Sequence, residues 1–131
     1  MAHILRVTGL KHWTAVGLVA AAVVAGAACK SDEITATGVA GEGQQLAESK
    51  GCTACHTPDG NKAAGPSWKG LWESQVTLED GPTVTADRGY IIESIRQPQA
   101  KIRKDSVGQM PKGDLTNEEI EKVIAYIMTL K

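Results

Sequence analysis

The sequence predicts an all-α domain with little sheet. The clearest support is the C-terminal segment, where Thr116 is followed three residues later by Glu119 in the pattern of a helix capping box. Apolar residues then recur at helical spacing, which predicts an amphipathic helix with one buried stripe. The stripe consists of Ile120, Val123, Ile124, Ile127 and Met128, with Tyr126 beside them.

Two further segments have the features of shorter helices. Residues 42–50 end at Gly51, which suits a helix C-cap, and this short helix is the natural packing partner for the C-terminal stripe. Residues 87–97 stop at Pro98, which cannot continue a helix. Their apolar side is formed by Tyr90, Ile91 and Ile95.

Short β-prone runs separate these helices. Val76 and Leu78, then Val84, flank the turn-forming residues 79–82, which predicts a small β-hairpin over residues 75–85. The expected architecture is therefore three to four helices with one possible hairpin.

The first 28 of the 131 residues have the features of an export signal peptide. Residues 1–12 carry Arg6 and Lys11 and no acidic residue, and residues 13–28 are uncharged and rich in Ala, Val and Gly. This apolar run is short for a transmembrane helix, which needs about 20 residues. An uncleaved N-terminal anchor is the alternative to cleavage.

Cys29 follows the apolar run directly. The sequence Gly26-Ala27-Ala28-Cys29 resembles a bacterial lipobox, although Gly26 stands where that pattern usually has Leu. Lipidation of Cys29 would anchor the chain to a membrane, and ordinary signal cleavage is the alternative. The polar residues 29–41 are predicted as a flexible tether, which leaves residues 42–131 as the folded domain.

Charge and size limit the function classes. Cleavage before Cys29 would leave 12 of the 14 basic residues and all 15 acidic ones, a formal charge of −3. Nothing in this balance predicts nucleic-acid binding. A domain of about ninety residues buries only a modest core, so a large apolar cofactor would be an integral part of the fold.

Residues 52–56 form the pentapeptide C-x-x-C-H, the attachment signature of c-type haem. The thiols of Cys52 and Cys55 can each add to one porphyrin vinyl group, and the His56 imidazole can coordinate the iron. A zinc site is one alternative, but it needs four ligands, and the other histidines lie in the predicted signal peptide. A thioredoxin-like dithiol is another, although no βαβ pattern surrounds Cys52.

The second axial ligand must come from elsewhere in the chain. After signal removal His56 is the only histidine, so the soft candidates are Met110 and Met128. Met128 belongs to the helical stripe, where methionine usually fills the core. Met110 lies in a loop with glycines and Pro111, from which it could reach the face opposite His56. An ordinary buried loop residue is the alternative for Met110.

A ligating imidazole normally donates its other N–H to a carbonyl or carboxylate. Pro66, ten residues after His56, could supply such a carbonyl from a rigid turn. Taken alone, Gly65-Pro66 is only a turn signal.

The order of these motifs resembles class I monohaem cytochrome c. Four runs of sequence are similar to the cytochrome c domain appended to cytochrome c oxidase subunit II. They are GPSWKGLW, VTLEDGPTVTAD, YIIESIRQPQAKI and QMPKGDLTNEEIEKVIAYI. They are also similar to lipoprotein cytochromes of respiratory complexes such as alternative complex III. The chain lacks the cysteines and histidines of the subunit II copper site, so only the tail of that subunit is resembled.

The resemblance implies one covalent haem c, held by Cys52, Cys55, His56 and Met110, with the Pro66 carbonyl accepting from His56. It also implies two features of the helix packing. Gly43 would sit where the first helix crosses the last, against Tyr126, and Ala47 stands where the family usually has Phe.

The implied function is a membrane-tethered electron carrier on the periplasmic side of a bacterial membrane. Its expected partner is a respiratory membrane complex or a haem–copper oxidase. The chain would serve this partner either as a mobile carrier or as a fixed subunit. A haem-based sensor or small-molecule redox enzyme with a displaceable Met110 is the alternative. A basic rim could face an acidic partner or be an ordinary solvated surface; it comprises Lys101, Arg103, Lys104 and Lys112.

Overall fold

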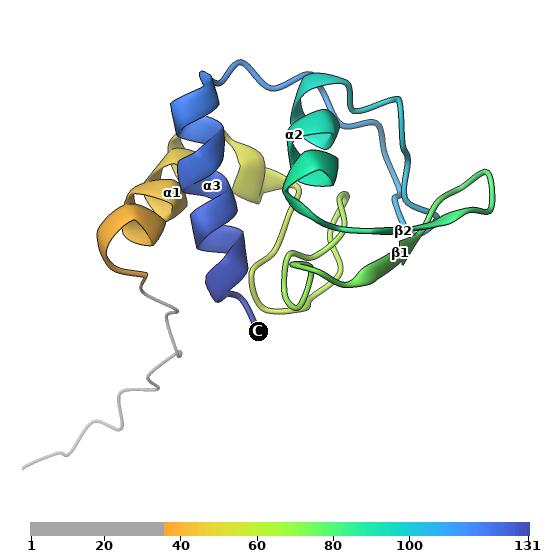
Figure 1. Cartoon of the computed structure of the whole chain (residues 1–131), viewed down its shortest axis with the longest axis horizontal. Helices are drawn as coiled ribbons and strands as arrows, with labels where there is room; N and C mark the ends of the chain where they lie inside the picture. Colours follow the sequence, from red (N-terminus) through yellow and green to blue (C-terminus); the bar gives the residue numbers. More distant parts are fainter. Residues whose placement is uncertain (1–35) are drawn as a thin grey trace, which may run out of the picture. The chain divides into compact units, whose positions relative to one another are not determined.

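The computed structural model describes residues 36–131, and over these residues it confirms a mostly helical fold with one small hairpin (Figure 1). The elements are α1 (Gly38–Ser49), the 3-10 turn η1 (Cys52–Ala54), β1 (Gln75–Thr77), β2 (Thr83–Thr85), α2 (Arg88–Arg96) and α3 (Asn117–Thr129). The predicted signal peptide, Cys29 and the first part of the tether lie outside the described residues. Within residues 36–131, no helix has the length and hydropathy needed to cross a membrane.

The first helix begins four residues earlier than predicted. Residues 38–41 were expected to close a flexible tether, but they form the first turn of α1. Glycine and valine, which make up most of this turn, are weak helix formers, and most helical stability in proteins comes from tertiary packing. The C-terminal end of α1 agrees with the prediction, because Gly51 adopts a left-handed φ of 76° just after the Lys50 cap.

Helix α3 begins at the predicted capping box. The Thr116 side chain accepts from the Glu119 N–H at 3.2 Å, and the Glu119 carboxylate accepts from the Thr116 N–H at 2.7 Å. Burial differs from the prediction at Met128, which is 44% exposed. The buried surface extends instead to Tyr126 on the other flank of the helix, so Met128 lies at the edge of the stripe rather than in the core.

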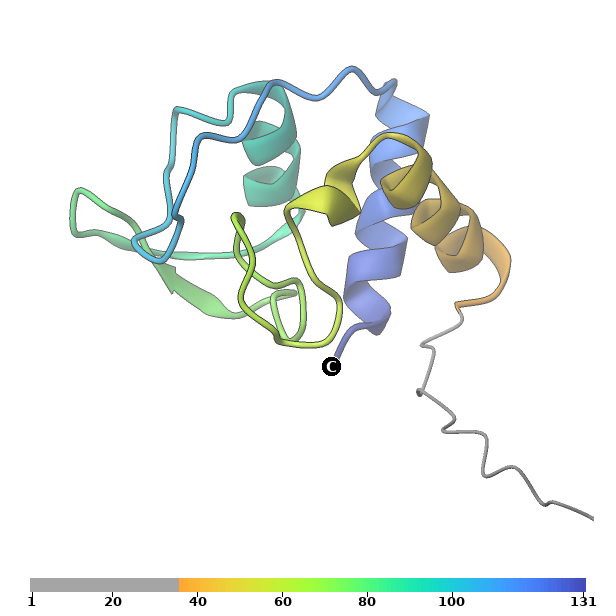
Figure 2. The ribbon, with the colours of Figure 1, turned by 180° about the vertical axis from the view of Figure 1, so that it is seen from behind.

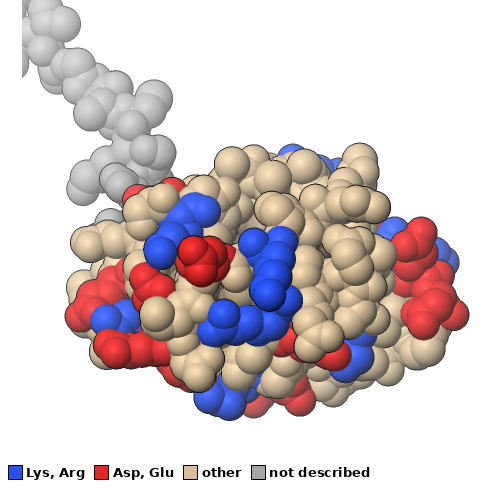
Figure 3. Space-filling view, turned by 90° about the horizontal axis from the view of Figure 1, so that it is seen from above, with Lys and Arg blue, Asp and Glu red and all other residues tan. Residues whose placement is uncertain are grey.

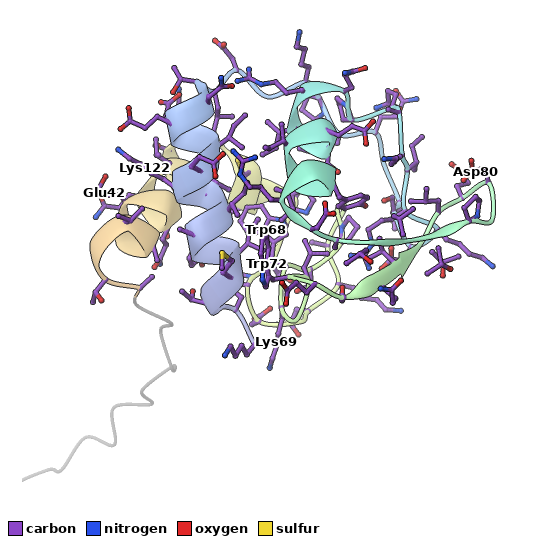
Figure 4. The ribbon with its side chains drawn as sticks, viewed as in Figure 1. Glu42, Trp68, Lys69, Trp72, Asp80 and Lys122 are labelled. Carbon is purple, nitrogen blue, oxygen red and sulfur yellow. The ribbon has the colours of Figure 1, made fainter. Side chains whose placement is uncertain are left out.

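The packing of α1 against α3 depends on a small residue (Figure 2). A Cβ atom at Gly43 would overlap the Lys122 carbonyl oxygen and lie 3.1 Å from the Tyr126 Cβ, which confirms the expected place of Gly43. Ala47 is fully buried in the same core. The Lys122 ammonium also reaches the Glu42 carboxylate of α1 at 2.9 Å (Figure 4).

The predicted hairpin is present and holds the connection between α2 and α3. Strands β1 and β2 are antiparallel, with Val76 opposite Val84. Beyond β1, the Glu79 N–H donates to the Ile102 carbonyl at 2.8 Å, and the Lys104 N–H donates to the Thr77 carbonyl at 3.0 Å. The hairpin is therefore bonded to the segment that leads towards Met110.

Candidate haem site

One cavity of about 330 Å³ brings together the site residues predicted within the described part of the chain. Its volume falls within the range of about 300–1,000 Å³ that is usual for cofactor sites. The predicted site residues along its lining are Cys52, Cys55, His56, Pro66 and Met110. The apolar walls come from α2 and α3 and include Tyr90, Ile91, Ile95, Val123 and Ile127.

The turn η1 presents the two thiols to this cavity. The Cys55 and His56 N–H groups both donate to the Cys52 carbonyl, at 3.2 and 3.0 Å, which closes the turn. No disulfide joins Cys52 and Cys55. Burial raises the pKa of the Cys52 thiol, against an opposing backbone hydrogen bond. A reactive redox dithiol needs a lowered thiol pKa, so this environment does not favour the dithiol alternative.

The zinc alternative lacks a ligand set in the described region. Across residues 36–131, no three His, Cys, Asp or Glu side chains gather closely enough to hold a metal ion. A structural zinc site needs four such ligands. The pentapeptide therefore does not belong to a zinc site built from these residues.

The tautomer of His56 follows from its hydrogen bond. Its Nδ1 lies 2.7 Å from the Pro66 carbonyl oxygen, and a carbonyl can only accept, so Nδ1 carries the proton. The lone pair is then on Nε2, where it is free to coordinate a metal. Burial lowers the pKa of His56, the Pro66 bond opposes this, and Arg103 lowers it further. The lowered pKa favours the neutral imidazole, the form that a ligand needs.

Two residues that contact the His56 imidazole were missed in the sequence analysis. A Cβ atom at Gly65 would lie only 2.6 Å from the His56 Cε1, so the imidazole packs directly on this glycine's backbone. Trp68 stacks on the imidazole with ring centroids 5.1 Å apart and planes 14° apart. The sequence signal was present in GPSWKG, but the glycine was interpreted only as part of a turn.

Met110 reaches the cavity from the long connection between α2 and α3. Its side chain is half-buried and packs against the core. Its carbonyl accepts a hydrogen bond from the Gln99 Nε2 at 3.2 Å, and the Gly113 N–H donates to the Ile95 carbonyl of α2 at 2.9 Å. Met128 does not line this cavity, which separates the two candidate sulfur ligands.

The basic residues around Met110 differ in their pairing. The Lys101 ammonium lies 2.6 Å from a Glu93 carboxylate oxygen, and Arg103 pairs with Asp105 at 2.8 Å. Among the described residues, no carboxylate pairs with the other two, the exposed Lys104 and Lys112. Figure 3 shows basic side chains near the centre of the face seen from above, with acidic side chains both among them and towards the two ends.

The donor set and the walls fit a covalently bound haem. Two unpaired thiols, a neutral imidazole with a free Nε2 and a thioether all line one largely apolar cavity. An imidazole and a thioether are an established pair of axial ligands for haem iron, and the two thiols of a C-x-x-C-H motif are the attachment points of haem c. The lining of the pocket therefore has the chemistry that this group requires.

Comparison with known proteins agrees with this chemistry. Residues 40–131 match the cytochrome c family. The chain is 31% identical to cytochrome c2 of Rhodospirillum rubrum, covering 88% of this chain and 98% of that protein. It is 32% identical to cytochrome c oxidase subunit 2 of Alkalihalophilus pseudofirmus, covering 82% of this chain but only 30% of the relative. The chain belongs to the cytochrome c family, as an electron carrier that binds haem c covalently.

Proposed function

We propose that this domain carries single electrons in a respiratory chain, tethered to the periplasmic side of a bacterial membrane. The observation that carries the proposal is the single cavity lined by both thiols of the haem motif, by His56 and by Met110. In this account Cys52 and Cys55 form the two thioethers, and His56 and Met110 are the two axial ligands. Haem supplies the one-electron redox chemistry when bound.

A histidine–methionine pair suits outer-sphere electron transfer, because it leaves no coordination position open and raises the reduction potential. The chain's own contribution is to hold both ligands and to exclude water with the α2 and α3 walls. No acid or base is required, since no proton is transferred.

Replacing Met110 tests the ligand assignment. We expect Met110→Ala to abolish the weak far-red sulfur-to-iron absorption band of the oxidised protein and to let the reduced protein bind carbon monoxide. Met128→Ala is the matched control, because Met128 is 44% exposed and lies outside the cavity lining. A band that survives in Met110→Ala would contradict the assignment.

The second candidate function is a haem-based sensor or small-molecule redox enzyme in which Met110 leaves the iron easily. This function is considered because Met110 lies in a loop rather than in a helix. Carbon monoxide binding to the unmodified reduced protein, together with a missing far-red band in its oxidised form, would support this function over electron transfer.

The tether is proposed to begin at a lipidated Cys29. Its support is the small-residue run that places a cysteine directly after the apolar segment. We expect mass spectrometry of the natively purified protein to find an acylated N-terminal Cys29, and Cys29→Ser to be released from the membrane fraction. An unmodified mature N-terminus would refute the lipid anchor.

The proposed partners are a quinol-oxidising complex and a terminal haem–copper oxidase. The similarity to cytochrome c oxidase subunit 2 supports an oxidase as the acceptor. Within the basic rim, Lys104 and Lys112 offer positive charge to an acidic surface. Electrostatic docking is screened by salt, so we expect the oxidation rate to fall as ionic strength rises. Stoichiometric co-purification in mild detergent would identify a fixed subunit instead of a mobile carrier.

A further inference from the structure

We propose that Trp68 is a positioning residue that sets the orientation of the His56 imidazole plane. The inference rests on the proposed function, in which His56 is the axial ligand. Its observation is the stack itself, with the two ring centroids 5.1 Å apart and the planes 14° from parallel. Trp68 is 7% exposed, so the indole stays against the imidazole rather than in solvent.

The hydrogen bond of His56 leaves one motion free. The Nδ1–Pro66 bond at 2.7 Å fixes the direction in which the ring points. A single hydrogen bond still allows the ring to rotate about the N–H···O axis, because carbonyl oxygens accept over a broad range of angles. A nearly parallel indole opposes that rotation, since turning the imidazole would drive its edge into the indole face.

The backbone of Trp68 is fixed by the scaffold. Its main-chain N–H donates to the Thr57 carbonyl at 2.8 Å, and its carbonyl accepts from the Leu71 N–H at 3.0 Å. The indole ring also meets Tyr126 edge-to-face, with centroids 6.2 Å apart and planes at 87°. Tyr126 is 2% exposed and lies at the crossing of α1 and α3 beside Gly43. The helix crossing is thus connected to the imidazole through two aromatic contacts.

The orientation of an axial imidazole affects the iron's electronic structure, because the ring's π orbitals overlap with different iron orbitals as the plane turns. Residues around a metal ligand commonly tune the metal through such orientation. Trp68 would therefore influence the reduction potential without touching the iron.

Trp72 provides a matched control within the same loop. It is half-buried and packs against the same core, yet it makes no ring stack with His56. Figure 4 labels both tryptophans, and the exposed Lys69 points to the edge of the molecule. Truncating Trp72 removes core contacts while leaving the stack intact.

The test uses the full haem-loaded chain with Trp68→Leu, Trp68→Phe and Trp72→Leu. We expect Trp68→Leu to change the order or spread of the paramagnetically shifted haem methyl signals in proton NMR and to displace the midpoint potential. Trp68→Phe keeps an aromatic face and should restore both readouts in part. Trp72→Leu should lower the thermal midpoint but leave the methyl pattern and the potential at their wild-type values.

The outcomes distinguish this inference from the proposed function. If Trp68→Leu keeps the wild-type methyl signals and midpoint potential, Trp68 is a core residue only. If Trp68→Leu fails to fold, the same conclusion follows when Trp68→Phe and Trp72→Leu both keep the wild-type values. An axial His56 should give hyperfine-shifted imidazole signals in the wild-type protein that are absent from His56→Ala. If the wild-type protein shows no such signals, the ligand assignment itself fails.

Discussion

The two sides of the haem site are built in different ways. On the His56 side, the imidazole is held by the Pro66 carbonyl, by the Gly65 backbone and by the Trp68 ring, within a short stretch of chain. On the Met110 side, the contacts are spread along a long loop, in which Gln99 donates to the Met110 carbonyl, Gly113 is bonded to α2 and the Val107 N–H donates to the Ala64 carbonyl at 3.3 Å. The comparison indicates a rigid histidine side and a more adaptable methionine side, a division that targeted substitutions can test.

The largest effect is expected at Gly65, where the histidine side has no spare room. The new Cβ of Gly65→Ala would lie 2.6 Å from the His56 Cε1 and 3.1 Å from the Cys55 carbonyl oxygen. Overpacking of this kind costs about 1–3 kcal/mol, and here it would also displace the ligand. We expect reduced haem incorporation and a lower thermal midpoint.

The matched control for Gly65→Ala is Gly108→Ala on the methionine side. A Cβ atom at Gly108 meets nothing within 4 Å, and its φ is not in the left-handed region. We expect this variant to incorporate haem normally. Equal damage from both substitutions would contradict the asymmetry.

A smaller effect is expected from Gln99→Ala, which removes the bond to the Met110 carbonyl. The loss of one such hydrogen bond costs about 0.5–1.5 kcal/mol, and it should fall mainly on the loop. In a denaturant titration, the far-red band should disappear at a lower concentration than in wild type, while the helical circular dichroism midpoint changes less.

Gln45→Ala, an exposed position on α1, is the control for this substitution and should change neither transition. Equal shifts of the band and the helical signal in Gln99→Ala would show that the loop has no local stability of its own.

The smallest effect is expected from the capping box of α3, the helix that supports Trp68 through Tyr126. The Thr116 backbone, then Lys50, hold the pKa of Glu119 below its usual value of 4.5. A lowered folded-state pKa contributes stability above the unfolded value that is lost as pH falls through the folded value. We expect Glu119→Gln to reduce stability at neutral pH and to weaken this acid dependence below pH 4.5, both measured by thermal midpoints.

Features encoded by short stretches of sequence could be predicted. The pentapeptide at 52–56, the capping box at Thr116 and the turn between β1 and β2 each depend on residues a few positions apart. Local chemistry determines such features, and the structure places them as expected. Pro66 also belongs here, since a turn ten residues after His56 brought its carbonyl within reach.

Features that depend on the packing of distant segments could not. The stack of Trp68 on His56 requires the loop to fold back on the turn, and the exposure of Met128 depends on which flank of α3 is covered. Helical periodicity locates an apolar stripe, but it does not specify which residues at the border of the stripe are covered by neighbouring segments.

Selective labelling of the methionine methyl groups is the sharpest test of whether Met110 is the axial ligand opposite His56. In the reduced protein, the porphyrin ring current shifts the methyl signal of an axial methionine far upfield. We expect one such signal, absent from Met110→Leu and retained in Met128→Leu. An upfield signal that survives in Met110→Leu, or methionine methyl signals that all have ordinary shifts, would exclude Met110 as the ligand.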